Sequence, residues 1–350
     1  MKRRSMEFMS STMTYSSAVN NATSAYSNVL FSVEKLPPSG YVFLQNIEPF
    51  YLSALIICSF AVAATVVLAL IHFCHIHLLV PDENVQSDLY YLALVFPIIG
   101  CCSLLAMYLP RSSKLMYAVC STYIMLSLLK VVTLMRDILG SRAALSRYLL
   151  DCGEMIRLDS IPFCCMKLPK ISTTEENIRR VEWLVVQSPI IRILLEVIMV
   201  IAFLEQFRIT VAIDIVEVLS MLAATYGCHT LMDLGKEKLD SYRFSLIFHI
   251  VNTAHIILTV QKFFFDLSSS LGLFTNGPLL RSLSKAMFWN NCALTIEMLI
   301  LSLIATKMVR PEKSDLFSTN ANNTTTTAAT ERQRWSANTN KDYWVETRFI

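Results

Sequence analysis

The chain has 350 residues, of which 54% are hydrophobic and only 16% are charged. Its net charge of +3 is small and scattered, which argues against a nucleic-acid-binding surface and against a polybasic lipid-binding patch. Several uninterrupted apolar stretches are about 20 residues long, enough for a helix to cross a hydrocarbon core of about 30 Å. The composition therefore predicts an integral membrane protein.

The predicted topology begins with an extracellular N-terminal tail, residues 1–48, which precedes the first long apolar stretch. Its basic start, MKRR, is not followed by an apolar segment, which argues against a cleaved signal peptide. The first spanning helix is therefore expected to serve as the targeting signal. The tail contains the sequon Asn21-Ala22-Thr23, which makes Asn21 a candidate glycosylation site.

Residues 49–310 are predicted to form an all-α transmembrane domain of seven helices. An odd number of spans places the two ends of the chain on opposite sides of the membrane. The segments that an extracellular N-terminus would place inside carry more Lys and Arg than the others, which favours a cytosolic C-terminus. The predicted spans cover approximately residues 49–72, 89–109, 115–136, 184–205, 211–232, 245–265 and 286–308.

A cytosolic loop is predicted over residues 137–183, and its stretch IPFCCMKLPK contains Cys164 and Cys165. Cytosolic thiols stay reduced, and the loop has no histidine and too few cysteines for a zinc site. Two interpretations remain. Either the pair is S-acylated (palmitoylated), which would hold the loop at the inner leaflet, or both cysteines are unmodified and pack against apolar side chains.

Charged residues inside the predicted spans are unfavourable in lipid and are therefore expected to face protein or water. The fourth span carries Arg192 and Glu196 four residues apart, on one face of a helix. One interpretation is that the two charges neutralise each other, or pair with another span, and fix the helix packing. The other is that Arg192 binds the carboxylate or sulfate of a substrate while Glu196 orients it.

The fifth and sixth spans also contain polar residues. Asp214 and Glu217 open the fifth span and are expected to lie at the membrane interface. The sixth span has a polar stripe that either lines a hydrated groove or hydrogen-bonds to other helices, and its Lys262 is expected to extend to the lipid headgroups. The residues of this stripe are His249, Asn252, His255, Thr259 and Lys262.

The last span contains Glu297, the deepest of its polar residues. A carboxylate at that depth is expected to belong to the substrate pathway or to a polar network in the core. After this span, residues 311–350 form a low-complexity segment with NANNTTTTAAT at its centre. Such a segment cannot bury enough apolar surface to offset chain entropy, so a disordered cytosolic tail is predicted.

Three stretches of the chain carry recognisable patterns. Residues 96–150 combine a Cys-Cys pair in a span, Pro-Arg-Ser at the next membrane edge and a basic loop that leads to further cysteines. With SLIFHIVNTAHIILTVQ in the sixth span and NCALTIEMLILSLI in the last, this stretch resembles the alpha subunit family of the organic solute transporter. The resemblance covers about residues 89–310, and matches Gln261 and Glu297 to the family's glutamine and acidic positions. The family's longer cysteine run is reduced here to Cys164 and Cys165.

The resemblance implies a seven-span protein of the cell membrane, with or without an endosomal pool, that moves amphipathic anions down their gradient. Bile acids and steroid conjugates are the implied substrates, and a single-span beta subunit is the implied partner, with a homo-oligomer as a further assembly. The chain shows no ATP-binding module and no clear ion-coupling pattern, so ATP-independent transport without a cofactor or metal is expected. The candidate pathway residues are Arg192, Glu196, His249, Asn252, His255, Gln261 and Glu297.

Other classes of function were weighed against transport. A regulator of membrane trafficking, or of receptor or lipid sorting, is the main alternative, because a transporter fold need not transport. A seven-span receptor is disfavoured since the last span has no Asn-Pro-x-x-Tyr and the third ends in MRD. An enzyme is disfavoured since no P-loop, nucleophile elbow or His-Glu-x-x-His occurs. The histidines of HFCHIH are interpreted as interfacial polar groups, with metal binding as the weaker alternative.

Overall fold

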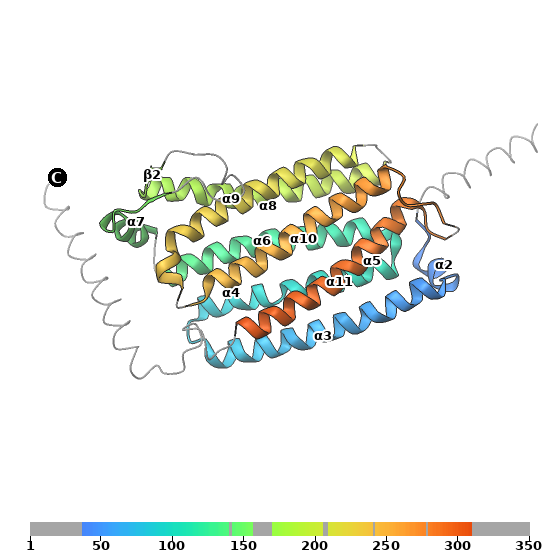
Figure 1. Cartoon of the computed structure of the whole chain (residues 1–350), viewed down its shortest axis with the longest axis horizontal. Helices are drawn as coiled ribbons and strands as arrows, with labels where there is room; N and C mark the ends of the chain where they lie inside the picture. Colours follow the sequence, from blue (N-terminus) through green and yellow to red (C-terminus); the bar gives the residue numbers. More distant parts are fainter. Residues whose placement is uncertain are drawn as a thin grey trace, which may run out of the picture.

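The structure, a computed structural model, shows a bundle of long helices that run roughly along one axis (Figure 1). It describes residues 37–139, 142–156, 170–205, 209–240, 242–277 and 279–309. Seven of its helical segments are long and apolar enough to cross a membrane, which confirms the predicted seven-span, all-α fold. These segments are Pro49–Leu79, Glu83–Tyr108, Pro110–Leu139, Glu175–Ala202, Val211–Leu234, Phe244–Ser270 and Ser282–Met308.

The helices and strands of the described residues follow one another through short connections. They are α2 (Gly40–Gln45), α3 (Pro49–Leu79), α4 (Glu83–Ala93), α5 (Val95–Tyr108), the 3-10 turn η1 (Pro110–Ser112), α6 (Ser113–Leu139), α7 (Arg142–Asp151), β1 (Met155–Ile156), β2 (Ile171–Ser172), α8 (Glu175–Leu204), α9 (Thr210–Leu239), α10 (Phe244–Ser270) and α11 (Ser282–Met308).

Local sequence explains several helix boundaries. Pro49 occupies the first turn of α3, where its missing N–H costs nothing. The side chain of Asp82 caps α4 by accepting a hydrogen bond from the backbone N–H of Asn84 at 3.0 Å. The second span is divided into α4 and α5 at Leu94, because Pro97 has no N–H to donate and its ring crowds the carbonyl one turn earlier.

Successive spans alternate in direction, so their ends gather at the two ends of the bundle (Figure 1). The short helix α2 lies at one end, called here the α2 end, together with the start of α9 and the end of α10. The opposite end, called the α7 end, carries α7 and the strands β1 and β2, which pair antiparallel. Helix α6 is central, since it packs against α4, α5, α8, α9 and α10.

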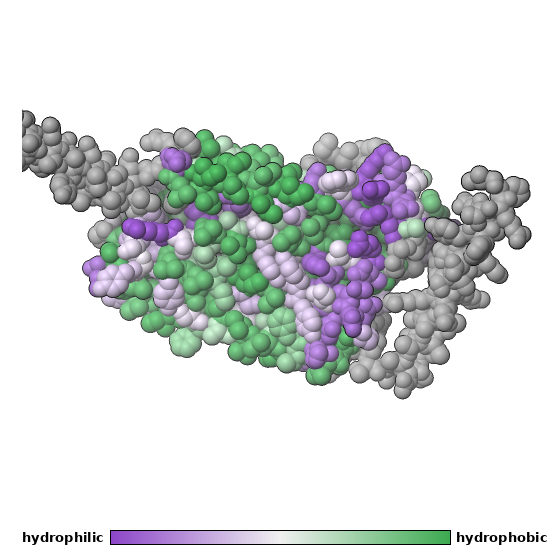
Figure 2. Space-filling view, turned by 180° about the vertical axis from the view of Figure 1, so that it is seen from behind, coloured by the Kyte–Doolittle hydropathy of each residue, from purple (hydrophilic) through white to green (hydrophobic). Residues whose placement is uncertain are grey.

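The surface of the bundle has the pattern of a membrane protein. Hydrophobic side chains cover much of the middle of the face in Figure 2, whereas hydrophilic side chains gather towards the α7 end. Large apolar side chains are strongly exposed on the spans, for example Phe60 on α3 at 73% and Leu194 on α8 at 59%. Such a surface is stable only in contact with lipid or with another protein.

Candidate functional site

Seven ionisable side chains from four helices converge inside the bundle, in the half nearer the α2 end. Each exposes 5% or less of its surface, although most charged residues in proteins are largely exposed. We call this group the charge cluster. Its members are Lys114 on α6, Arg192 and Glu196 on α8, Asp214 and Glu217 on α9, and Lys262 and Asp266 on α10.

Arg192 occupies the inner part of the charge cluster and is 1% exposed. Its Nη2 donates a hydrogen bond to Tyr117 Oη at 2.8 Å and lies 3.3 Å from Glu217 Oε2. Its Nε donates to the hydroxyl of Ser121 and lies 3.5 Å from Glu196 Oε1. Its Nη1 is buried and has no hydrogen-bond partner among the described residues. The ion pairs therefore leave one edge of the guanidinium available.

Lys262 links the carboxylates of the outer part of the cluster. Its Nζ forms an ion pair with Asp214, lies 3.3 Å from Asp266 Oδ2 and lies 3.8 Å from Glu217 Oε2. Lys114 in turn pairs with Asp266 at 3.1 Å, near the start of α6. Alternating charges thus extend from the end of α6 inwards to Arg192. The prediction that Lys262 extends to the headgroups is wrong, because α10 packs against α9 and directs the amine to carboxylates inside the bundle.

The same packing corrects the placement of Asp214 and Glu217. The sequence predicts both at the membrane interface, but they are 2% and 1% exposed. Each lies on the side of α9 that meets Lys262 of α10, so burial is accompanied by an ion pair. The prediction of an interfacial position is therefore wrong for both residues, and α9 contributes two carboxylates to the interior.

The charge cluster contains four carboxylates and three cations, so full ionisation would leave one negative charge in excess. Glu196 is the carboxylate with the weakest pairing. It shares Arg192 with Glu217, and neither of its oxygens has a hydrogen-bond partner within the described ranges. The cluster ties four helices together, and removal of one partner from such a buried network typically costs about 3–5 kcal/mol.

The polar stripe of α10 divides into two parts. Asn252 joins α10 to α9, because its Oδ1 accepts from Thr225 Oγ1 at 3.3 Å and its Nδ2 lies 3.4 Å from His229 Nε2. His255 and Thr259 are also buried, at 0% and 2% exposed. Neither ring nitrogen of His255, nor the hydroxyl of Thr259, has a hydrogen-bond partner in the described part of the chain.

The remaining predicted pathway residues lie outside the charge cluster. His249 is exposed on α10, with its ring centroid 5.8 Å from that of His229. Gln261 and Glu297 are half-buried and interact with each other between α10 and α11. Gln261 Oε1 and Glu297 Oε2 have no hydrogen-bond partner among the residues that the structure describes. Asn21, Cys164 and Cys165 lie outside the described residues.

A lateral groove of about 500 Å³ opens between α6 and α8. Its walls are almost entirely apolar, and Glu196 is the one ionisable residue among the described residues that line it. The groove opens onto the side of the bundle, since Leu115, Val119 and Val197 on its walls are 54%, 44% and 52% exposed. The surplus carboxylate of the charge cluster therefore borders a lipid-facing groove.

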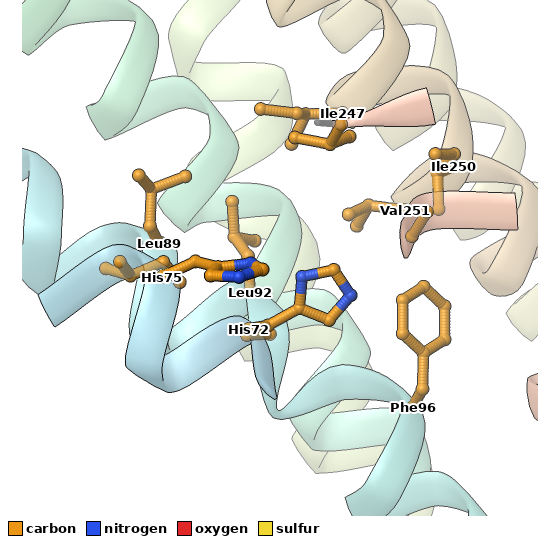
Figure 3. A pocket seen from close by; sticks show the side chains of 12 residues that line it. His72, His75, Leu89, Leu92, Phe96, Ile247, Ile250 and Val251 are labelled. Carbon is orange, nitrogen blue, oxygen red and sulfur yellow. The ribbon is translucent and has the colours of Figure 1, made fainter. Parts of the chain in front are cut away.

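A second, smaller cleft of about 80 Å³ lies nearer the α7 end (Figure 3). The rings of His72 and His75 project from α3 at one side, and Phe96 and Val251 lie across from them. His72 Nε2 lies 2.9 Å from Thr306 Oγ1, so one histidine joins α3 to α11. No group of three metal-ligating side chains gathers here or elsewhere in the described ranges.

Four residues that touch or belong to the site were not singled out from the sequence. Lys114 and Asp266 complete the outer ion pairs, while Tyr117 and Ser121 accept hydrogen bonds from Arg192. The ring of Tyr117 also lies 4.8 Å from the amine of Lys262. The spacing of Lys262 and Asp266, one helical turn apart, was the available signal.

The seven spans and the ionisable interior define a multi-pass helical membrane protein. A family model described as organic solute transporter Ostalpha matches residues 54–313, and the chain belongs to this family. Organic solute transporter alpha-like protein 1 of Caenorhabditis elegans is 35% identical over 291 residues, which cover 81% of this chain and 76% of the relative. Alpha-like protein 3 of the same organism is 34% identical over 288 residues, covering 80% and 83%. No solved structure matches the chain.

Family membership confirms the resemblance found in the sequence and supports a role in transport of organic solutes. The span of the match, residues 54–313, includes every member of the charge cluster. The interior site is therefore part of the region that defines the family.

Proposed function

We propose that the chain is a facilitative, ATP-independent transporter subunit for amphipathic organic anions such as steroid conjugates or bile-acid-like sterols. One observation carries the anion assignment: Arg192 Nη1 is buried without a hydrogen-bond partner among the described residues. His255 and Thr259 present further unpartnered polar atoms in the same interior, and Arg192 and His255 are close enough to interact electrostatically. A substrate carboxylate or sulfate would accept a hydrogen bond from this edge of the guanidinium.

The ion pairs suggest how an anion could bind without leaving a carboxylate isolated. Glu217 lies between two cations, 3.3 Å from Arg192 and 3.8 Å from Lys262. When Arg192 turns to the substrate, Glu217 retains Lys262. A buried polar group without a partner costs about 1–3 kcal/mol, so the arriving anion relieves an existing penalty. Binding by exchange of partners is weak enough to be reversible, as passive transport in both directions requires.

The apolar body of the substrate needs a different surface. The cleft of Figure 3 supplies one, because apolar side chains of α4, α5 and α10 line it and the histidines of α3 border it. This cleft and the charge cluster lie in opposite halves of the bundle. An amphipathic substrate would therefore pass from one type of surface to the other as it crosses, with its own concentration gradient as the driving force.

The proposal includes an orientation and partners. The α2 end faces the outside and the C-terminus lies in the cytosol of a cell-membrane protein that also has an endosomal pool. Asn21 is glycosylated on this topology, and acylation of Cys164 and Cys165 holds the cytosolic loop at the inner leaflet. A single-span beta subunit, or a second copy of the chain, completes the assembly. The positive-inside pattern of the sequence supports this arrangement.

Flux of a sulfated steroid tests the proposal. Uptake and efflux of the radiolabelled compound are measured in cells that express the chain alone or with a candidate single-span partner, with surface protein quantified in parallel. Saturable flux in both directions, unaffected by ATP depletion or sodium removal, is expected. Absence of flux from cells with confirmed surface protein and partner would contradict the proposal and favour the trafficking function.

A further inference from the structure

The groove between α6 and α8 has the form of a binding site for one rigid, mostly apolar molecule. Its volume of about 500 Å³ falls in the usual range for small-molecule pockets, about 300–1,000 Å³. The stretch of α6 that lines it, from Leu115 to Leu126, spans roughly 16 Å along the helix. Ile193 and Val197 of α8 form the facing wall.

Glu196 supplies a single polar contact in this apolar groove. It is 3% exposed, and both carboxylate oxygens lack a hydrogen-bond partner within the residues that the structure describes. The nearest cation atom, Arg192 Nε, lies 3.5 Å from Oε1 and already donates to Ser121. A carboxylate in this state accepts hydrogen bonds and donates none, so the missing partner is a donor such as a hydroxyl group.

Charge decides which kind of amphipathic molecule fits. The charge cluster has one more carboxylate than it has cations, and the surplus is the one that borders the groove. An anionic headgroup or an anionic steroid conjugate would meet this negative charge at short range in a medium of low dielectric constant. A neutral molecule with a hydroxyl group avoids that repulsion and satisfies the carboxylate.

We propose that the α6–α8 groove binds a neutral hydroxysterol from the membrane, with the sterol hydroxyl donating a hydrogen bond to Glu196 and the ring system lying along the apolar walls. A sterol has one hydroxyl at the end of a rigid apolar body, which matches one acceptor beside one apolar groove. The site is separate from the anion path proposed above and does not depend on it. Its ligand is a lipid component that stays with the protein.

Photolabelling in membranes tests the assignment. Full-length protein is expressed in cells, membranes are labelled with a photoactivatable, alkyne-tagged 3β-hydroxysterol, and the labelled peptides are identified by mass spectrometry. The expected label falls on the α6 and α8 segments that line the groove, and unlabelled sterol competes it away. Label confined to other helices, or stronger competition by a phospholipid than by the sterol, would overturn the proposal.

A pair of matched variants separates the groove from the rest of the lipid-facing surface. Ala118→Phe fills the groove from α6, whereas Ala64→Phe adds the same ring to an exposed position on α3. We expect Ala118→Phe to reduce labelling at least fivefold and Ala64→Phe to leave it unchanged, at equal surface protein. Equal labelling of the two variants would refute binding in this groove.

The contribution of the hydroxyl is tested by competition. In the wild type, the methyl ether of the sterol should compete at least fivefold less well than the alcohol, because it cannot donate to Glu196. Glu196→Met leaves the cluster with three carboxylates and three cations, and should abolish this difference between the two competitors. A difference that persists in Glu196→Met would overturn the assigned contact.

Steroid-sulfate flux measured in the same cells keeps the two proposals distinct. Loss of sterol labelling in every wild-type preparation, with flux intact, would remove the sterol site and leave the transport proposal standing. Specific labelling without flux would support the sterol site and contradict the transport proposal.

Discussion

Replacing Arg192 with methionine is expected to destabilise the folded protein strongly. In the native protein, the guanidinium lies 3.5 Å from Glu196 Oε1 and 3.3 Å from Glu217 Oε2. Glu217 would keep Lys262 at 3.8 Å, but Glu196 would lose its cation at a position that is 3% exposed. The cluster would then hold four carboxylates and two cations.

The loss of one partner from a buried ion pair costs about 3–5 kcal/mol, a large share of a typical stability of about 5–15 kcal/mol. With a shift of about 2–4 °C in Tm per kcal/mol, the expected decrease in Tm is about 6–20 °C. Thermal stability is measured by fluorescence-detected size-exclusion chromatography of heated detergent extracts, with surface biotinylation in parallel.

A compensating variant distinguishes a charge effect from loss of side-chain packing. Arg192→Met combined with Glu196→Gln removes one cation and one carboxylate, so the surplus of one carboxylate is unchanged. We expect the double variant to recover most of the lost Tm and surface amount. A double variant as unstable as Arg192→Met, or an Arg192→Met variant as stable as the wild type, would refute the reasoning.

The remaining predictions concern other residues. Lys262→Met should lower Tm by a similar amount, because Asp214 and Asp266 lose a shared cation; an unchanged Tm in the same heating assay would contradict the burial of this amine. Changing both Cys164 and Cys165 to serine should lower metabolic acyl labelling and surface delivery, and unchanged labelling would show that the loop is held in another way. Asn21→Gln should abolish the gel shift caused by a glycosidase; a shift that survives would place the glycan elsewhere.

The fold was accessible from the sequence because the hydrophobic signal of a spanning helix is long and strong. The seven apolar segments predicted the seven spans, and their ends differ from those of the helices mainly where a helix continues beyond the hydrocarbon core. Helix α3, for instance, extends to Leu79 although the predicted span ends near residue 72. Residues outside the core lack the apolar signal, yet they continue the backbone hydrogen bonding of the helix.

The pairing of charges was only partly accessible. The spacing of Arg192 and Glu196 predicted a contact within α8, and the structure places the two side chains 3.5 Å apart. The partners on α6, α9 and α10 depend on how the helices pack, which no local pattern encodes. The sequence alone therefore suggested that Arg192→Met would leave surface protein unchanged. The contact with Glu217 of α9 changes that expectation.

Position along a span was also a poor guide to burial. Lys262 and Asp214 lie near the ends of apolar segments, where lysine side chains often extend to the headgroups and carboxylates often face water. In the bundle, each lies on the side of its helix that faces a neighbouring helix, so they pair with each other. The face of the helix, rather than depth in the membrane, determines whether such a residue is buried.

The central claim is that Arg192 binds the anionic group of the substrate, and one comparison tests it most directly. Saturable flux of a radiolabelled sulfated steroid is measured for Glu196→Gln and for Arg192→Met with Glu196→Gln, each with the partner subunit and normalised to surface protein. The two variants differ only at Arg192. The account predicts at least tenfold lower flux per surface molecule for the double variant. Equal flux for the two variants would contradict it.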